Sequence, residues 1–222
     1  AASSSVTNFQ ATWRDCSGLT GTFPLIDTSS ATNFSATWQG CSGITTFPLI
    51  DTSNVTSFSA TWTACNSLTS FPLIDTSSGT NFSFTWDTNI GLTSFPQIDT
   101  SSATDINNAW KGCTGITTFP SLNFSNVTKF AGAWRDCTSL TTYPANRFDS
   151  TGTLVSTAFN NSWLNCALTA QSIENILTSL DTNGAQNITL NISGGTNAAK
   201  TTWSTAANTA YTNLINKGWT IS

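Results

Sequence analysis

Cysteine is the residue type in this chain with the widest chemistry, and its copies follow a regular pattern. Each lies three positions after a tryptophan: Cys16, Cys41, Cys65, Cys113, Cys137 and Cys166, with Asn89 at the one position where the series is interrupted. Stacked repeats would bring neighbouring thiols to about 5 Å, within disulfide reach, but each run of three leaves one thiol over. A straight row cannot surround zinc tetrahedrally, and the chain has no histidine. We therefore favour buried free thiols, with disulfides between neighbours as the alternative.

Aspartates form a second series, which ends where Asn123 and Arg147 take over. Its members are Asp27, Asp51, Asp75 and Asp99. Carboxylates about 5 Å apart could bind Ca²⁺ together with neighbouring Thr and Ser oxygens. Asp-Thr-Ser before an apolar segment is also typical of the start of a helix or turn. We favour the capping interpretation and predict no metal and no cofactor.

No residue stands out as a catalyst. Without histidine the usual general base is missing, and no Ser or Cys can be distinguished from its copies in other repeats. Glu174 is the only glutamate, and it lies in a predicted C-terminal helix with no partner evident in the sequence. The chain is therefore predicted not to be an enzyme.

A repeat of 24 residues positions all of these side chains. The six prolines recur at this interval: Pro24, Pro48, Pro72, Pro96, Pro120 and Pro144. An aromatic residue precedes each proline, and a tryptophan lies ten or eleven residues before it: Trp13, Trp38, Trp62, Trp86, Trp110 and Trp134. Such a period predicts a solenoid in which stacking supplies the core, with the tryptophans and cysteines as its structural ladders.

Within one unit, Ile44-x-x-Phe47-x-Leu49 has the spacing of a short parallel strand of a leucine-rich repeat. Apolar residues at i, i+3 and i+7 over residues 55–62 then suggest a short helix. The fold class is predicted as α/β: a leucine-rich-repeat solenoid of about seven 24-residue strand-plus-short-helix coils over residues 1–166, the last coil irregular.

The pattern changes after Cys166. Apolar residues at helical spacing between 173 and 180 predict one helix, and a second is predicted from about Ala198 to Lys217. Short strands are predicted at 188–192 and 219–221. Atypical terminal units cover the open end of a repeat array, so residues 167–222 are predicted to be a C-terminal α/β cap packed on the same solenoid.

Composition excludes several classes of partner. Charged residues are only 8% of the chain, against about 25% in ordinary proteins. The net charge of −4 provides no basic stripe for phosphates, so nucleic acid is not expected as a partner. No apolar run approaches membrane-spanning length, and no membrane insertion is expected. The first residues already read as the middle of a repeat, so we expect a longer chain N-terminal to Ala1.

Residues 51–70, Asp-Thr-Ser-Asn-Val-Thr-Ser-Phe-(x3)-Trp-(x2)-Cys-(x2)-Leu-Thr-Ser, carry a family resemblance. This unit resembles the D-T-S-N-V-T-x-M-x-x-M-F-x-x-C-x-x-L-T-S-L unit of BspA-type and mycoplasma-type surface leucine-rich repeats, with Trp where that family usually has Phe. The resemblance covers roughly residues 4–142. Residues 190–199 and 217–220 look like the ending of repeat proteins from phages and bacterial surfaces. Such families are implied to be secreted, surface-bound or virion-bound adhesins.

The candidate ligand-binding face consists of the strand positions that alternate with the predicted buried ones. They are Thr46, Pro48, Ile50, Ser70, Pro72, Ile74, Ser94, Pro96, Ile98, Thr118 and Pro120. If all of them point outward, they form a flat, uncharged strip that suits a glycan or protein partner. The alternative is that Ile50 and its equivalents turn inward.

These observations predict a non-enzymatic recognition or adhesion module of a phage (virion, tail-associated) or bacterial surface protein. It would bind a host or cell-surface glycan or protein through the repeat face, and it would be located outside the cell, on the cell surface or on a virion. A structural spacer is the first alternative. Ice binding through regular Thr rows is the second.

Overall fold

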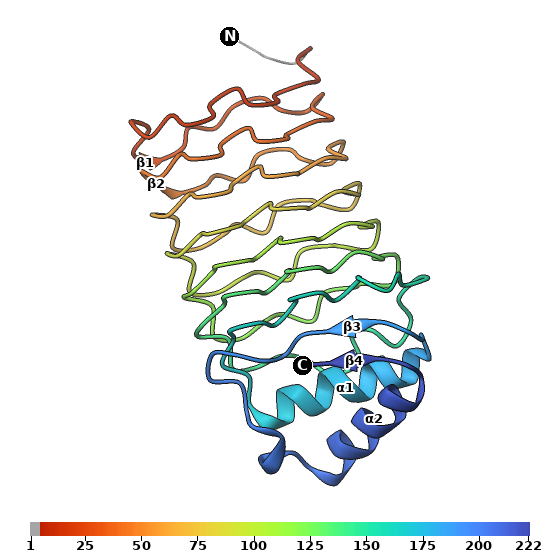
Figure 1. Cartoon of the computed structure of the whole chain (residues 1–222). Helices are drawn as coiled ribbons and strands as arrows, with labels where there is room; N and C mark the ends of the chain where they lie inside the picture. The colour runs from red at the N-terminus through yellow and green to blue at the C-terminus, as the bar shows by residue number, and fades with distance from the viewer. Residues whose placement is uncertain (1–4) are drawn as a thin grey trace.

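Regular elements are few and short in the computed structural model, which describes residues 5–222 (Figure 1). Helices α1 (Ala170–Asn183) and α2 (Thr205–Asn216) and the 3-10 helix η1 (Lys200–Thr202) all lie in the C-terminal region. The strands are β1 (Gly21–Thr22), β2 (Ile44–Thr46), β3 (Thr189–Leu190) and β4 (Thr220–Ile221). They form two parallel pairs, β1 with β2 and β3 with β4.

The predicted α/β leucine-rich-repeat solenoid of about seven strand-plus-short-helix coils is therefore wrong. Within residues 5–222, two small sheets are the only sheets, and both α-helices lie after residue 169. The segment 55–62, predicted as a repeat helix, contains turns at 59–62, a bridge at Ser57 and no helix. The first four residues of the predicted 1–166 domain lie outside the described residues.

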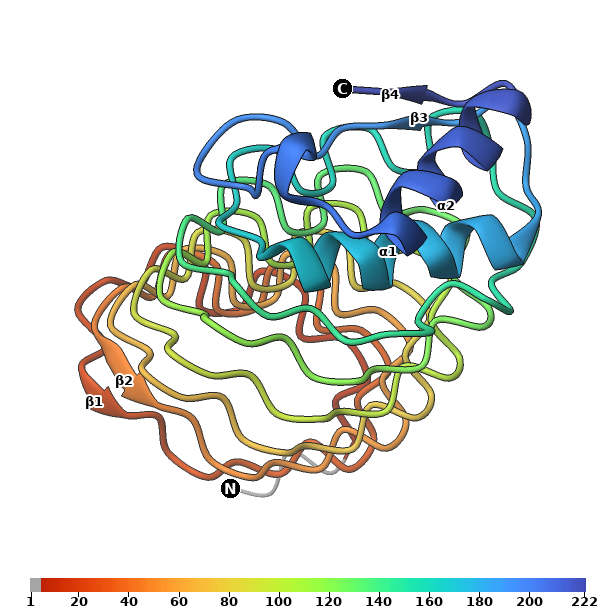
Figure 2. The same ribbon diagram turned by 90° about the horizontal axis from the view of Figure 1, so that it is seen from below.

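Successive repeats pack on one another in parallel register, and we call each repeat a layer, named by its tryptophan. Isolated parallel bridges join Asn33 to Ser57, Ser57 to Asn81 and Asn81 to Asp105. The layers follow one another in sequence order from the red N-terminal end towards the blue helices (Figure 1). Figure 2 shows their loops one behind another, with α1 and α2 beyond the last of them.

Alternating hydrogen bonds explain why turns replace the predicted helix. In the Trp62 layer, the main-chain N–H groups of Phe58, Ala60, Trp62 and Ala64 donate to the carbonyls of Asn81, Ser83, Thr85 and Asp87 in the next layer, at 2.8–2.9 Å. The N–H groups of Thr61, Thr63 and Cys65 close turns onto the carbonyl three residues earlier, at 3.1–3.3 Å. An α-helix would keep all of these donors within its own segment. Here four of the seven donors join the next layer instead.

These turns force alanine into an unusual backbone conformation. Ala60 and Ala64 have φ angles of 55° and 59°, and Ala36 has 55°. The left-handed region costs a residue with a Cβ atom roughly 1–2 kcal/mol, while glycine enters it freely. Glycine does occupy the equivalent positions Gly40 and Gly132.

Ala60→Gly is therefore expected to raise the free energy of unfolding by roughly 0.5–1 kcal/mol, because relief of backbone strain outweighs the added freedom of the unfolded chain. Urea denaturation measures the change. Ala145→Gly is the control at an exposed alanine outside the left-handed region, and it should lower stability slightly. An Ala60→Gly protein less stable than wild type would contradict the assigned strain.

Tryptophan rings form the central column of the interior. Trp38, Trp62, Trp86, Trp110 and Trp134 are fully buried, and Trp13 at the start of the column is half-buried. Neighbouring rings from Trp13 to Trp134 are nearly parallel, with centroids 5.3–6.1 Å apart. Phenylalanines that precede the prolines meet these rings edge-on, as Phe47 does with Trp38 at 4.7 Å. Offset and edge-on contacts are the geometries that aromatic rings prefer.

The cysteine ladder lies beside the tryptophan column. Cys41, Cys65, Cys113, Cys137 and Cys166 are buried, and Cys16 is exposed; all six are free thiols. Each buried thiol donates to the carbonyl of a tryptophan in the preceding layer, at 3.0–3.2 Å. Burial raises the pKa of Cys41 to about 11 and that of Cys65 to about 12. These thiols therefore stay protonated at neutral pH, as donation requires.

The C-terminal region rests on the last layer through α1. Ser172 Oγ accepts the N–H of Tyr143 at 2.9 Å, and Ser179 Oγ accepts that of Phe148 at 2.8 Å. Thr169 caps the start of α1, and Gly184, with a φ of 78°, ends it. Helix α2 packs on α1. Both helices thus sit at the end of the stack opposite the first layer (Figure 2).

Candidate binding face

The predicted face divides into residues that point outward and residues that do not. Thr46, Ser70, Ser94 and Thr118 are exposed, and Pro48, Pro72, Pro96 and Pro120 are half-buried. Ile50, Ile74 and Ile98 are instead buried, with exposed fractions of 5%, 4% and 2%. The prediction that these isoleucines belong to the face is wrong.

A tight turn after each proline explains the inward isoleucines. The N–H of Ile50 donates to the carbonyl of Pro48 at 3.0 Å, and Ile74 and Ile98 make the same bond. A bond between residues i and i+2 closes a γ-turn, which breaks the alternation of side chains along an extended strand. The turn directs the residue before the isoleucine outward instead.

The residues that replace the isoleucines were missed by the sequence pattern. Leu25, Leu49 and Leu73 are 72%, 67% and 63% exposed. Gln97 and Ser121 continue the row and are also exposed. The appearance of polar residues in the row was the available signal, because a position that accepts Gln and Ser is not a core position.

A second hydroxyl row lies beside the first, since both residues before the buried phenylalanine are exposed. Its members are Thr45, Thr69, Thr93 and Thr117. We define the repeat face as the two hydroxyl rows, the prolines and the exposed leucines. Neighbouring hydroxyls can contact one another, as Thr22 Oγ1 and Thr46 Oγ1 do at 2.6 Å. No charged side chain belongs to the repeat face, so its side chains can offer hydroxyl and apolar contacts only.

Main-chain groups add hydrogen-bonding capacity in the middle of this face. Strands β1 and β2 join the first two layers, and a bridge joins Thr118 to Thr142. Between them, Ser70 and Ser94 form no main-chain hydrogen bond within residues 5–222. The peptide groups of Ser70 and Ser94 therefore remain open to an outside partner.

The aspartate series lies at the adjoining corner and closes turns rather than starting helices. Asp51 Oδ1 accepts the N–H and Oγ–H of Ser53 at 3.0 and 2.7 Å. Asp75 makes the same pair of bonds with Ser77, and these bonds hold the pKa of Asp75 below its ordinary value. A carboxylate that accepts two local donors is a turn-forming residue. Among the residues that the structure describes, no cluster of His, Cys, Asp or Glu could hold a metal ion.

Comparison of the chain with models of known families, with curated proteins and with solved structures finds no match. Within residues 5–222, no helix is both long and apolar enough to cross a membrane. A functional assignment therefore depends on the chemistry of the repeat face.

Proposed function

We propose that this chain is a non-enzymatic recognition module that binds an uncharged cell-surface glycan through the repeat face. The module would belong to a phage or bacterial surface protein and act outside the cell, on a cell surface or on a virion. The observation that carries the proposal is the row of exposed Leu25, Leu49 and Leu73 next to rows of hydroxyl groups. Contiguous exposed apolar side chains of this kind mark interaction sites.

The chemistry of the face supports a glycan. Sugar rings present C–H surfaces that can pack on the leucines and prolines, and hydroxyls that can bond with Thr and Ser side chains. Ser70 and Ser94 add open peptide groups at the centre. The repeat of one layer after another also suits a polymer whose units recur. An ionic partner would find no charge to pair with on this face.

Ser70→Lys is expected to weaken glycan binding at least about tenfold, because an ammonium group would have to be desolvated without a partner in a neutral contact. A glycan array, followed by titration of the best ligand, measures the effect. Thr138→Lys is the matched control: it makes the same type of change at an exposed hydroxyl residue outside the repeat face. It should leave binding within about twofold of wild type.

Equal glycan binding by wild type and Ser70→Lys would show that the repeat face is not the binding site. If deletion of one complete 24-residue layer also preserved function, the chain would be a structural spacer. If the chain bound a host protein but no glycan, and Ser70→Lys weakened that binding, the repeat face would still be the binding site and its ligand would be a protein.

A further inference from the structure

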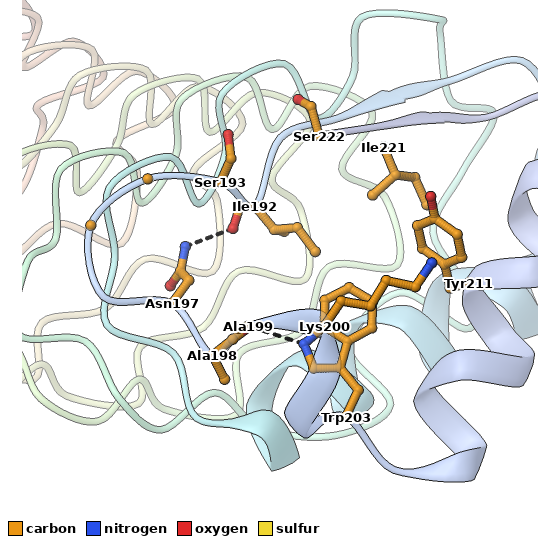
Figure 3. A pocket seen from close by; sticks show the side chains of 12 residues that line it. Ile192, Ser193, Asn197, Ala198, Ala199, Lys200, Trp203, Tyr211, Ile221 and Ser222 are labelled. Carbon is orange, nitrogen blue, oxygen red and sulfur yellow. Dashed lines mark hydrogen bonds between the residues drawn. The ribbon is translucent and has the colours of Figure 1, made fainter.

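A pocket of about 360 Å³ lies in the C-terminal region, formed by residues that do not belong to the repeat face (Figure 3). The loop from Ile192 to Ala199 forms one wall, and η1, α2 and the end of β4 form the rest. Its surface combines Trp203 and Tyr211 with the apolar Ile221. The exposed hydroxyls of Ser193 and Ser222 lie at its border. A pocket with aromatic walls and a few polar groups is the usual form of a small-molecule site.

Lys200 carries the only charged side chain among the residues that line this pocket, and its ammonium group makes no ion pair within residues 5–222. Five of the chain's seven cations pair with aspartates: Arg14, Lys111, Lys129, Arg135 and Lys217. Arg147 donates to main-chain carbonyls. Within residues 5–222, Lys200 makes no ion pair and no side-chain hydrogen bond; its Nζ lies 3.3 Å from the centroid of the Tyr211 ring. The exposed Lys200 ammonium group therefore has no hydrogen-bond acceptor among the described residues, and its donors can serve a ligand.

The aromatic residues and the loop are held in place by hydrogen bonds. Trp203 Nε1 donates to the carbonyl of Ala198 at 2.9 Å, which fixes the indole against the loop. Asn197 Nδ2 donates to the carbonyls of Ile192 and Trp163 at 2.9 and 3.0 Å. The Trp163 ring stacks on Trp134 at 4.8 Å, so these bonds tie the loop to the tryptophan column. The Tyr211 ring meets Trp203 edge-on at 6.0 Å. The pocket is thus preorganised, which lowers the cost of binding.

We propose that this pocket binds a single sugar ring that carries a carboxylate, of the hexuronate type. Lys200 pairs with the carboxylate, and Trp203 and Ile221 pack against the ring. Ser193 can exchange hydrogen bonds with the sugar hydroxyls, and Ser222 Oγ, which accepts the Nδ2–H of Asn191 at 2.6 Å, can donate to them. A phosphate ligand is less well served, because phosphate sites use Arg, several cations or a helix N-terminus, and this pocket has one lysine. The site is separate from the repeat face and does not depend on the function proposed for that face.

Titration of the whole ¹⁵N-labelled chain with sodium glucuronate tests the site by NMR. The indole N–H signal of Trp203, identified by its loss in Trp203→Phe, should shift saturably, with a dissociation constant on the order of 1 mM or below. Glucose has the same ring without the carboxylate, and it should bind at least about tenfold more weakly.

Lys200→Gln should weaken glucuronate binding at least about tenfold and leave glucose binding unchanged. Lys129→Gln, at an exposed lysine that pairs with Asp105, removes the same charge elsewhere and should leave glucuronate binding within about twofold. Failure of glucuronate to shift the Trp203 signal, equal affinity for glucose, or equal losses in both lysine variants would overturn the proposal. Ser70→Lys alters only the repeat face and should leave the glucuronate titration unchanged. The two proposals can therefore fail independently of each other.

Discussion

Trp110→Ala is expected to lower the free energy of unfolding by about 3–5 kcal/mol, the range for removing a fully buried large aromatic side chain. Trp110 stacks on Trp86 at 5.3 Å and on Trp134 at 6.0 Å. Phe95 and Phe119 meet its ring edge-on at 5.3 and 4.9 Å. The truncation therefore leaves a cavity at an interface with both neighbouring layers. Denaturation in urea measures the loss.

Two variants show whether the loss comes from stacking. Trp13→Ala, in the first layer, removes a half-buried ring with a tryptophan neighbour on one side only, and should cost less. Trp110→Phe should also cost less than Trp110→Ala, because the buried indole N–H has no hydrogen-bond partner within residues 5–222 that would be lost. Equal losses for Trp13→Ala and Trp110→Ala would contradict a core built by stacking.

Asn89→Cys is expected to raise the free energy of unfolding by about 1–3 kcal/mol. Asn89 occupies a cysteine position of the ladder and is fully buried. Neither its Nδ2 nor its Oδ1 has a hydrogen-bond partner within residues 5–222. A thiol at this position can donate to the carbonyl of Trp62, just as Cys65 donates to Trp38 and Cys113 to Trp86. The substitution replaces two unsatisfied groups by one satisfied donor.

Cys113→Asn is the reciprocal variant and should lower stability by a similar amount, because it places the same amide in the same kind of position. Urea denaturation in the presence of a reducing agent measures both changes, since reduction keeps neighbouring thiols from pairing. An Asn89→Cys protein that is less stable than wild type would show that the amide is better accommodated than the thiol.

The period of the chain can be predicted from its sequence, but the conformation within a period cannot. Equal spacing of Trp62, Trp86 and Trp110 indicates equivalent environments, because identical packing requires identical chain length between copies. The spacing of Phe58 and Trp62, four residues apart, is common to an α-helix and to two successive four-residue turns. Only the direction of the N–H bonds distinguishes them. Alanine at Ala60 gives no sign of the left-handed backbone that a glycine would suggest.

The candidate sites show the same limit. Leu49 and Ile50 are adjacent apolar residues, and the sequence does not distinguish them. The γ-turn from Pro48 to Ile50 directs the leucine outward and the isoleucine into the core. Composition alone could predict that the face is neutral, because charges are scarce along the whole chain. The pocket in the C-terminal region has no sequence signature. Ile192, Lys200 and Tyr211 come together only when the 192–199 loop, η1 and α2 pack against one another.

The hydrogen bonds between layers also give the molecule a mechanical character. They join residues 23 or 24 apart, as Phe58 to Asn81 and Thr80 to Thr56 do, so each layer is held chiefly by its two neighbours. Tension between the two ends would load these interfaces in series, and each layer that detached would release about 24 residues, or roughly 80 Å of chain. A chain of this design is expected to lengthen in discrete steps under force and to shorten again as layers re-form, which pulling on single molecules would measure.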